Sequence, residues 1–130
     1  MRIRSRKGQG ITEAVAAAFI LIPIALCLFD FLVVIIANSM NDTACKNAAR
    51  AAANQPTTKT AGDAAALSLQ SLHSPLISNI AMPNVTYTPG VAVSVTTRIT
   101  VHLPVPFPGY SDLTFDASDV EPIVGAPPPN

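Results

Sequence analysis

The sequence predicts an α+β protein in which a long N-terminal helix is followed by a short helix and a small antiparallel sheet of two to three strands. Three observations lead to this fold class. Residues 14–37 are an apolar run with one charge and one proline, and residues 38–53 are rich in alanine and contain no helix breaker. Residues 91–103 alternate between apolar and polar side chains, which is the period of a strand with one buried face.

Composition separates this chain from ordinary soluble domains. Of its 130 residues 49% are hydrophobic and only 12% are charged, about half the usual charged share. The net charge is zero, but all four cations of the N-terminal segment precede the first acid: Arg2, Arg4, Arg6 and Lys7. A basic end before an apolar run is typical of membrane topology. Nucleic-acid binding is not expected, because no second basic patch or aromatic platform accompanies these cations.

The apolar run from Ala14 to Ala37 predicts a membrane-spanning helix. Its 24 residues would extend about 36 Å as a helix, enough to cross a hydrocarbon core of about 30 Å with some tilt. A secretory signal peptide also begins with cations, but its apolar region is shorter, about 7–15 residues. The cations predict that the N-terminus lies in the cytoplasm and that residues from about 40 onward lie outside.

Local signals divide the rest of the helical part. Residues 38–53 should continue the spanning helix as a stalk, which stops at Pro56 because proline removes a backbone donor. The stretch from Thr60 to Asp63 has a capping side chain and an acid, as at the start of a helix. This second helix ends before Pro75, and its apolar face is expected to contain Leu67, Leu69 and Leu72.

The sheet is expected from three segments of a head that comprises residues 55–122. Residues 85–88 predict a short strand in a loop-rich passage, and residues 91–103 predict the clearest strand. Residues 104–110 are proline-rich and predict a connection to a return strand at 113–118. The tail, residues 123–130, is predicted to be disordered.

No residue pattern in the chain predicts catalysis. Cys27 and Cys45 lie 18 residues apart, about 27 Å along one helix, so they cannot pair and are best interpreted as small apolar fillers. His73 and His102 have no acid, cysteine or histidine at ligand spacing, so no metal site is expected. The sequence also lacks a nucleophile elbow, a phosphate-binding loop and a carboxylate pair. We therefore expect neither enzymatic activity nor a cofactor.

Two carboxylates near the apolar run need an explanation. Asp30 lies past the midpoint of the predicted span, where a charge costs about 2–3 kcal/mol. Either it reaches toward the outer interface or protonates, or it meets a polar partner on another helix. Glu13 stands near the start of the helix, where an anion is favourable in the first turn. That explanation accounts for the acid but not for the cations, glycine and glutamine that precede it.

Residues 6–13, RKGQGITE, resemble the processing site of type IV pilin-like proteins. In that family a membrane-bound prepilin peptidase removes a short basic leader after a glycine, and the mature chain has glutamate at its fifth position. The resemblance implies that residues 1–8 are the leader, that cleavage falls between Gly8 and Gln9, and that Glu13 is the fifth mature residue. Residues 9–54 would then be the transmembrane and stalk helix.

The chain is similar in particular to the TadE-like pseudopilins of tight-adherence pili. The shared features are the glutamine after the cleavage site, the alanine-rich helical continuation, the extracellular β segment, and an acidic and aromatic membrane end at residues 28–31. The resemblance implies a minor pilin or pseudopilin, single-pass in the bacterial inner membrane, that can enter an extracellular pilus. The partners it implies are like or related pilin subunits, the prepilin peptidase, the inner-membrane assembly platform and membrane lipid.

The resemblance also assigns roles to residues of the span. Cleavage would create an α-amino group on Gln9, and Glu13 of the same or a neighbouring subunit would neutralise it when helices pack side by side. Pro23 departs from the family pattern and should kink the helix or require a partner for a freed carbonyl. An alternative from another class is a single-span anchor whose head binds a ligand or envelope component without polymerising.

Overall fold

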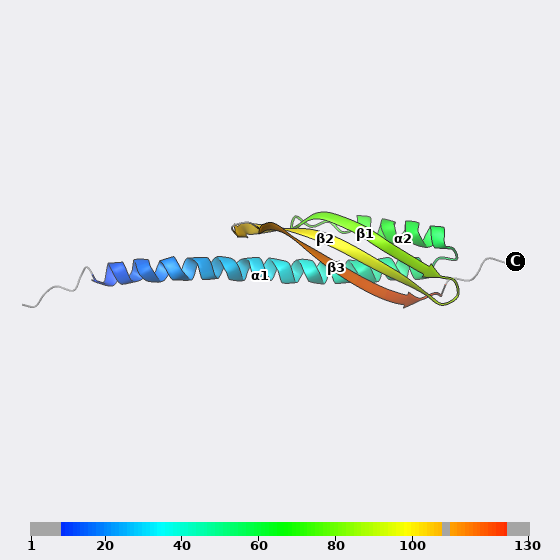
Figure 1. The fold of residues 1–130 in the computed structure, drawn as a ribbon, viewed down its shortest axis with the longest axis horizontal. Coiled ribbons are helices and arrows are strands. Elements are labelled where there is room, and N and C mark those ends of the chain that lie inside the picture. The colour runs from blue at the N-terminus through cyan, green and yellow to red at the C-terminus, as the bar shows by residue number, and fades with distance from the viewer. Residues whose placement is uncertain (1–8, 108–109, 125–130) are drawn as a thin grey trace, which may run out of the picture.

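The computed structural model describes residues 9–107 and 110–124 and confirms the predicted α+β fold class. Its antiparallel sheet has the strand order β1-β2-β3. Figure 1 shows α1 along the whole length of the molecule, with the sheet and α2 beside its C-terminal half. The elements are α1 Gln9–Ala53, α2 Thr58–Gln70, β1 Ile77–Thr88, β2 Ala92–Phe107 and β3 Tyr110–Pro122.

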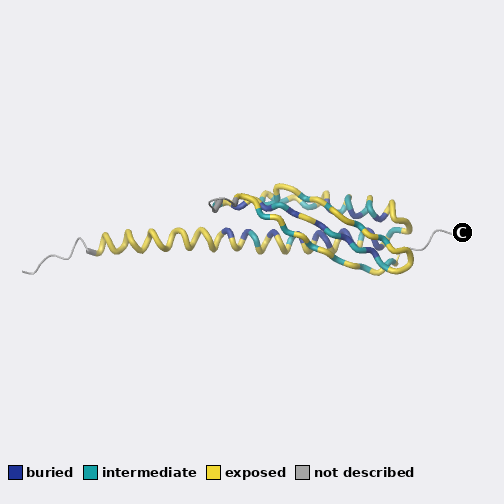
Figure 2. The backbone as a smooth tube through the Cα atoms, viewed as in Figure 1, coloured by how far each residue is buried: buried dark blue, intermediate teal, exposed yellow. Residues whose placement is uncertain are grey.

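The core lies between the sheet and the C-terminal half of α1. The sheet contributes one face of β2, whose buried residues alternate as predicted: Val93, Val95, Thr97, Ile99, Val101 and Leu103. The helix contributes a stripe that recurs every three or four residues and consists mostly of small side chains: Asp30, Val33, Ala37, Asn41, Ala44, Cys45, Ala48, Ala49, Ala52 and Ala53. These small side chains allow the strands to lie close to the helix axis, and Figure 2 shows that burial begins only halfway along α1.

The second helix begins earlier than its sequence suggested. Thr57 is the N-cap, because its hydroxyl accepts a hydrogen bond from the backbone N–H of Thr60 at 3.3 Å. The prediction of a start at Thr60 with Asp63 in the first turn was therefore wrong. The predicted apolar face was also partly wrong, since Leu67 is exposed and the buried residues are Ala61, Ala65 and Leu69. These three residues recur every fourth position and pack in the core with α1.

Both strands of the first hairpin are longer than predicted. β1 begins at Ile77 rather than at residue 85, and it contains Pro83. An edge strand tolerates proline, and the pairing register shifts between Ala81 and Asn84, around this residue. β2 continues through Pro104 to Phe107, where a connection was expected, and its register with β3 is irregular beyond His102.

The turn between β1 and β2 has a clear local cause. The backbone N–H of Val91 donates to the carbonyl of Thr88 at 3.0 Å, with Pro89 and Gly90 at the two central positions. Gly90 has a φ of 70°, which L-residues with a side chain rarely adopt. Proline followed by glycine at positive φ is the pattern of a type II turn.

The end of β3 is fastened to the end of α1. The backbone N–H of Ile123 donates to the carbonyl of Val91 at 3.3 Å, and that of Val124 donates to Ala53 at 3.1 Å. The sequence predicts a disordered tail at residues 123–130, and this prediction is wrong for these two residues. The remainder of that tail, residues 125–130, and the proposed leader, residues 1–8, lie outside the described residues.

Candidate functional site: the bare half of α1 and its junction with the head

The head leaves the N-terminal half of α1 uncovered. Every residue from 10 to 29, here called the bare half of α1, is exposed. Large apolar side chains are exposed throughout this segment: Ile11, Val15, Phe19, Ile20, Leu21, Ile22, Ile24, Leu26, Leu28 and Phe29. Because several of them are consecutive, they lie on all sides of the helix. Figure 2 shows the segment exposed along its whole length. By length and composition α1 is a candidate membrane span. A helix that is apolar all round must be covered by lipid or by other helices.

Gln9 and Glu13 lie one helical turn apart at the start of this half. Gln9 is the first residue of α1, and the first turn contains no acid, so Glu13 belongs to the second turn. The helix-dipole effect falls off within the first turn, which weakens the interpretation of Glu13 as a simple dipole partner. Glu13 is exposed and therefore accessible to another chain. Gly8, the predicted residue before the cleavage point, lies outside the described residues.

Pro23 lies inside α1, and the helix passes through it without interruption. Figure 1 shows no sharp bend in the bare half, so the predicted kink is not visible there. The other expected consequence concerns the carbonyl of Phe19, because proline has no N–H to donate to it. A hollow of about 300 Å³ lies on this part of the helix, lined by Val15, Ala18, Phe19, Ile22 and Pro23. This hollow offers an apolar side chain of another helix a place to pack.

Asp30 marks the junction between the bare half and the head. The residue is only 4% exposed, and its Oδ1 accepts a hydrogen bond from the backbone N–H of Val105 at 3.2 Å. Its Oδ2 is buried without a hydrogen-bond partner among the described residues. The sequence leaves open whether Asp30 reaches toward the outer interface or protonates, or whether it meets a polar partner on another helix. The structure gives Asp30 a partner in β2 of the same chain, 75 residues away in sequence.

A buried polar pair fixes the middle of the contact between α1 and the sheet. Thr97 Oγ1 donates to Asn41 Oδ1 at 2.8 Å, and Asn41 Nδ2 donates to the carbonyl of Phe115 at 3.2 Å. Asn41 and Thr97 are both fully buried. Sequence reasoning did not identify this pair. One signal was available, since Thr97 occupies a core-facing position in a strand whose other core-facing residues are Val, Ile and Leu.

Cys45 continues this contact one turn further along α1. Its Sγ lies 3.3 Å from the carbonyl of Val95 and 3.4 Å from that of Ala117, and it donates a weak hydrogen bond to them. The thiol is fully buried, whereas Cys27 is exposed on the bare half, and both cysteines are free. Cys45 thus fills a narrow space between the helix and two strands, as expected of a small apolar filler.

The outer surface of the head carries ion pairs that sequence reasoning did not find. Arg98 donates to both carboxylate oxygens of Asp116 at 2.6 and 2.7 Å. Through these hydrogen bonds the guanidinium holds the pKa of Asp116 below its usual value. Further ion pairs join Lys46 to Asp42 and Arg50 to Glu121, and a hydrogen bond joins His102 to Asp112. All are at least partly exposed, and none forms a catalytic arrangement.

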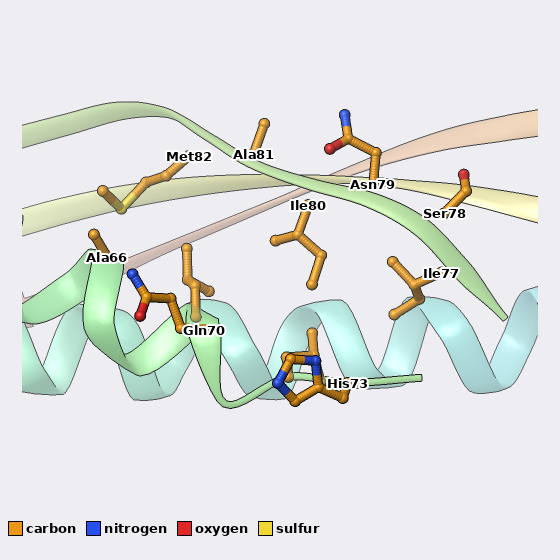
Figure 3. Close-up of a pocket in the computed structure, with 11 residues that line it drawn as sticks. Ala66, Gln70, His73, Ile77, Ser78, Asn79, Ile80, Ala81 and Met82 are labelled. Carbon is orange, nitrogen blue, oxygen red and sulfur yellow. The ribbon is translucent and has the colours of Figure 1, made fainter. Parts of the chain in front are cut away.

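A groove of about 440 Å³ lies between α2 and β1 (Figure 3). Ile77 and Ile80 point from β1 toward the helices, whereas Ala81 points away. The polar side chains that line the groove are Gln70, His73, Ser78 and Asn79, and no Asp, Glu, Lys or Arg lines it. Within residues 9–107 and 110–124 no group of three His, Cys, Asp or Glu side chains could hold a metal ion.

No family model, curated protein or solved structure matches this chain. The interpretation below therefore depends on the geometry of the chain itself and on the resemblance carried by residues 6–13.

Proposed function

We propose that this chain is a structural pilin-like subunit, a minor pilin or pseudopilin similar to the TadE-like proteins, and that it acts in the assembly of a pilus or adhesion filament. The observation that carries this proposal is the division of α1. One half packs one face against a folded head, while every residue of the other half, from 10 to 29, is exposed and large apolar side chains occur throughout it. The bare half of such a subunit can lie in a membrane, and it can later pack against the helices of other subunits in place of lipid.

The length of the bare half fits a membrane, and its small residues fit contact with other helices. Its 20 residues extend about 30 Å, which matches the hydrocarbon core of a bilayer. Small residues at positions 14, 16, 17 and 18 allow other helices to approach closely. In the proposed assembly Glu13 neutralises the new α-amino group on Gln9, since a charge buried among apolar helices requires an opposite charge.

The proposed location is the bacterial inner membrane. The N-terminus faces the cytoplasm, where a prepilin peptidase cuts after Gly8, and the head lies outside. The four cations before the bare half support this orientation. The assembly platform of the inner membrane and related pilin subunits are the proposed partners.

The first prediction concerns the N-terminus of the native protein. Mass spectrometry of the chain isolated from its own host should give a mature start at Gln9. Gly8→Leu should leave a full-length precursor in the membrane, because a peptidase that accepts a bare glycine would meet a side chain. Gly62→Ala is the matched control, since a Cβ at Gly62 meets no atom within 4 Å, and it should be processed normally. A native chain that retains Arg2 to Lys7 would contradict the pilin proposal.

The groove between α2 and β1 favours a second candidate, a single-span anchor whose head binds a ligand. This groove is formed within one chain and is open to solvent, so it requires no assembly. A plain anchor would keep residues 1–7, and the same mass measurement therefore separates the two functions.

A further inference from the structure

The sheet begins to pack against α1 before the apolar run of the sequence ends. The apolar run of the sequence extends to Ala37, but in the structure the sheet already covers one side of α1 from Asp30 onward. Val33 and Ala37 are buried in a cluster with Ile99 and Val101 of β2. One face of about two turns of the apolar run therefore belongs to the core of the head.

The end of the sheet beside residues 30–37 of α1 carries polar groups that would be unfavourable in the hydrocarbon core of a membrane. β1 and β3 each have one strand neighbour among the described residues, so the outer edge of each is not paired with a further strand. Open sheet edges do not occur within the hydrocarbon region, where no water satisfies their backbone N–H and C=O groups. His102 Nδ1 and Asp112 Oδ1 form an exposed hydrogen bond of 3.0 Å on the same end of the sheet, and these polar side chains would also lose their water.

We infer that the hydrocarbon span of α1 ends at Phe29, and that the head rests on the outer leaflet with residues 30–36 in the lipid headgroup layer. This inference rests on the membrane placement proposed above. The bare half, residues 10–29, alone matches a hydrocarbon core of about 30 Å, so a further two turns are not needed to cross. The headgroup layers extend the bilayer to about 40–45 Å, which leaves room for those turns at the surface.

The side of α1 opposite the sheet fits this placement. Residues 31–36 carry four exposed apolar side chains there: Phe31, Leu32, Ile35 and Ile36. They continue the bare half directly and need cover from water. The boundary between headgroups and acyl chains provides it, while the polar outer face of the sheet remains in water. Asp30 then lies at the boundary, shielded by β2 and bonded to Val105.

The test measures the depth of single spin labels in the full chain. In a Cys27→Ala background, cysteines are placed at Phe19, Ile24, Ile36 and Leu67, labelled with a nitroxide, and reconstituted in phosphatidylcholine vesicles at low protein-to-lipid ratio. Cys45 is buried, and its lack of labelling is verified in the background protein. Collision with oxygen reports hydrocarbon, and collision with a water-soluble nickel chelate reports water or headgroups.

We expect oxygen to dominate at Phe19 and Ile24, and the nickel chelate to dominate at Leu67. Ile36 should be at least tenfold more accessible to the nickel chelate than Ile24. Equal accessibility to the nickel chelate at Ile36 and Ile24 would refute the boundary at Phe29, but it would not contradict the membrane span itself. Protection of Ile36 from both reagents would mean that a second copy, not lipid headgroups, covers it. Nickel access at Phe19 would instead refute the membrane span of the proposed function.

A second variant separates the sheet from the charge as the cause of the boundary. Asp30→Asn removes the charge but keeps an oxygen that accepts from Val105. If the sheet sets the boundary, the nickel accessibility of Ile36 should not change in this variant. A fall of Ile36 to the value of Ile24 would show that the carboxylate alone keeps the segment out of hydrocarbon, and would overturn the inference.

Discussion

Asn41 lies at the centre of the contact between α1 and the sheet, and its amide bonds to one buried and one partly buried group. It accepts from the hydroxyl of Thr97 and donates to the carbonyl of Phe115. Asn41→Ala should therefore lower the free energy of unfolding by about 1–3 kcal/mol, because the buried hydroxyl of Thr97 loses its acceptor and the partly buried carbonyl of Phe115 loses this donor. Asn47→Ala, an exposed position on the same helix, is the control and should change stability little.

Cys45 provides the measurement for this prediction. Its thiol is fully buried against the sheet and becomes reactive when the head separates from α1. Urea titrations of the full chain in detergent, with Cys27 replaced by Ala, can therefore follow Cys45 labelling. Equal midpoints for Asn41→Ala and Asn47→Ala would show that the buried pair does not contribute to docking of the head.

The ion pair between Asp116 and Arg98 should make the stability of the head depend on pH. Arg98 donates to both of its oxygens, and this lowers the pKa of the carboxyl from its ordinary 3.8. A lowered pKa in the folded state contributes stability that is fully present above 3.8 and is lost as the pH falls through the folded value. Asp116→Asn should thus lower the unfolding midpoint slightly at pH 6, and the difference from the unmodified chain should shrink below pH 3.8.

The effect of Asp116→Asn should be small, because both partners are about half exposed and water screens the pair. Asp63→Asn is a suitable control, since Asp63 is exposed and forms no ion pair with any described residue. A midpoint difference for Asp116→Asn that persists unchanged at pH 2.5 would contradict a contribution from the ionised pair.

The elements of this fold differ in how well their sequences predict them. α1 and the middle of β2 follow from regular patterns: one is a long segment whose proline does not interrupt the helix, the other a strict alternation. β1 was underestimated because Pro83 and its polar neighbours indicate a loop, whereas an edge strand tolerates both. The start of α2 was ambiguous, since Thr57 and Thr60 are both capping residues.

The candidate site shows a similar division. The basic segment, Glu13 and the apolar run can be identified from local sequence alone. The partner of Asp30 could not, because Val105 lies 75 residues away and the bond depends on the register between α1 and β2. The same holds for Asn41 with Thr97, which lie 56 residues apart. Contacts of this kind are set by packing of the whole head on the helix, and no local spacing encodes them.

The alanine-rich stripe of α1 is predicted to control how closely the sheet can lie on the helix. Ala48 is fully buried in the cluster that contains Val93 and Val95 of β2. Ala48→Leu should overpack this contact and lower the free energy of unfolding by about 1–3 kcal/mol, as measured by Cys45 labelling in urea. Asn47→Leu adds a similar side chain on the exposed side and should leave the midpoint near that of the unmodified chain.

The molecule as a whole places two different interfaces on one helix. Residues 30–53 of α1 bind the head through a narrow stripe of small side chains, so the head is complete within one chain. The exposed apolar side chains of the bare half are covered only when lipid or other helices surround it. A substitution in the bare half should therefore alter the proposed assembly without altering the fold of the head. For this reason the proposed role of Glu13 in assembly can be tested without destabilising the head.

Glu13 has two competing roles that differ in size. As a partner of the helix dipole it would contribute about 0.3–1 kcal/mol, and less from the second turn, where the structure places it. As the partner of a buried α-amino group its removal would leave an uncompensated charge, at about 3–5 kcal/mol. Only the second role is large enough to prevent a subunit from entering an apolar bundle of helices.

Glu13→Ala should therefore be inserted in the membrane and processed at Gly8, yet be absent from the assembled filament. Cys45 should stay as protected as in the unmodified chain, because the head begins to cover α1 only at Asp30, 17 residues further along. The measurement is the abundance of the subunit in sheared filaments relative to the membrane fraction, with Asp63→Ala as an exposed acid of the head for control. Blocking the amine of Gln9 should cause a similar loss, since it leaves the carboxylate without its partner. If Glu13→Ala enters filaments as abundantly as Asp63→Ala, Glu13 is a local helix residue, and another feature of the bare half must set the register between subunits.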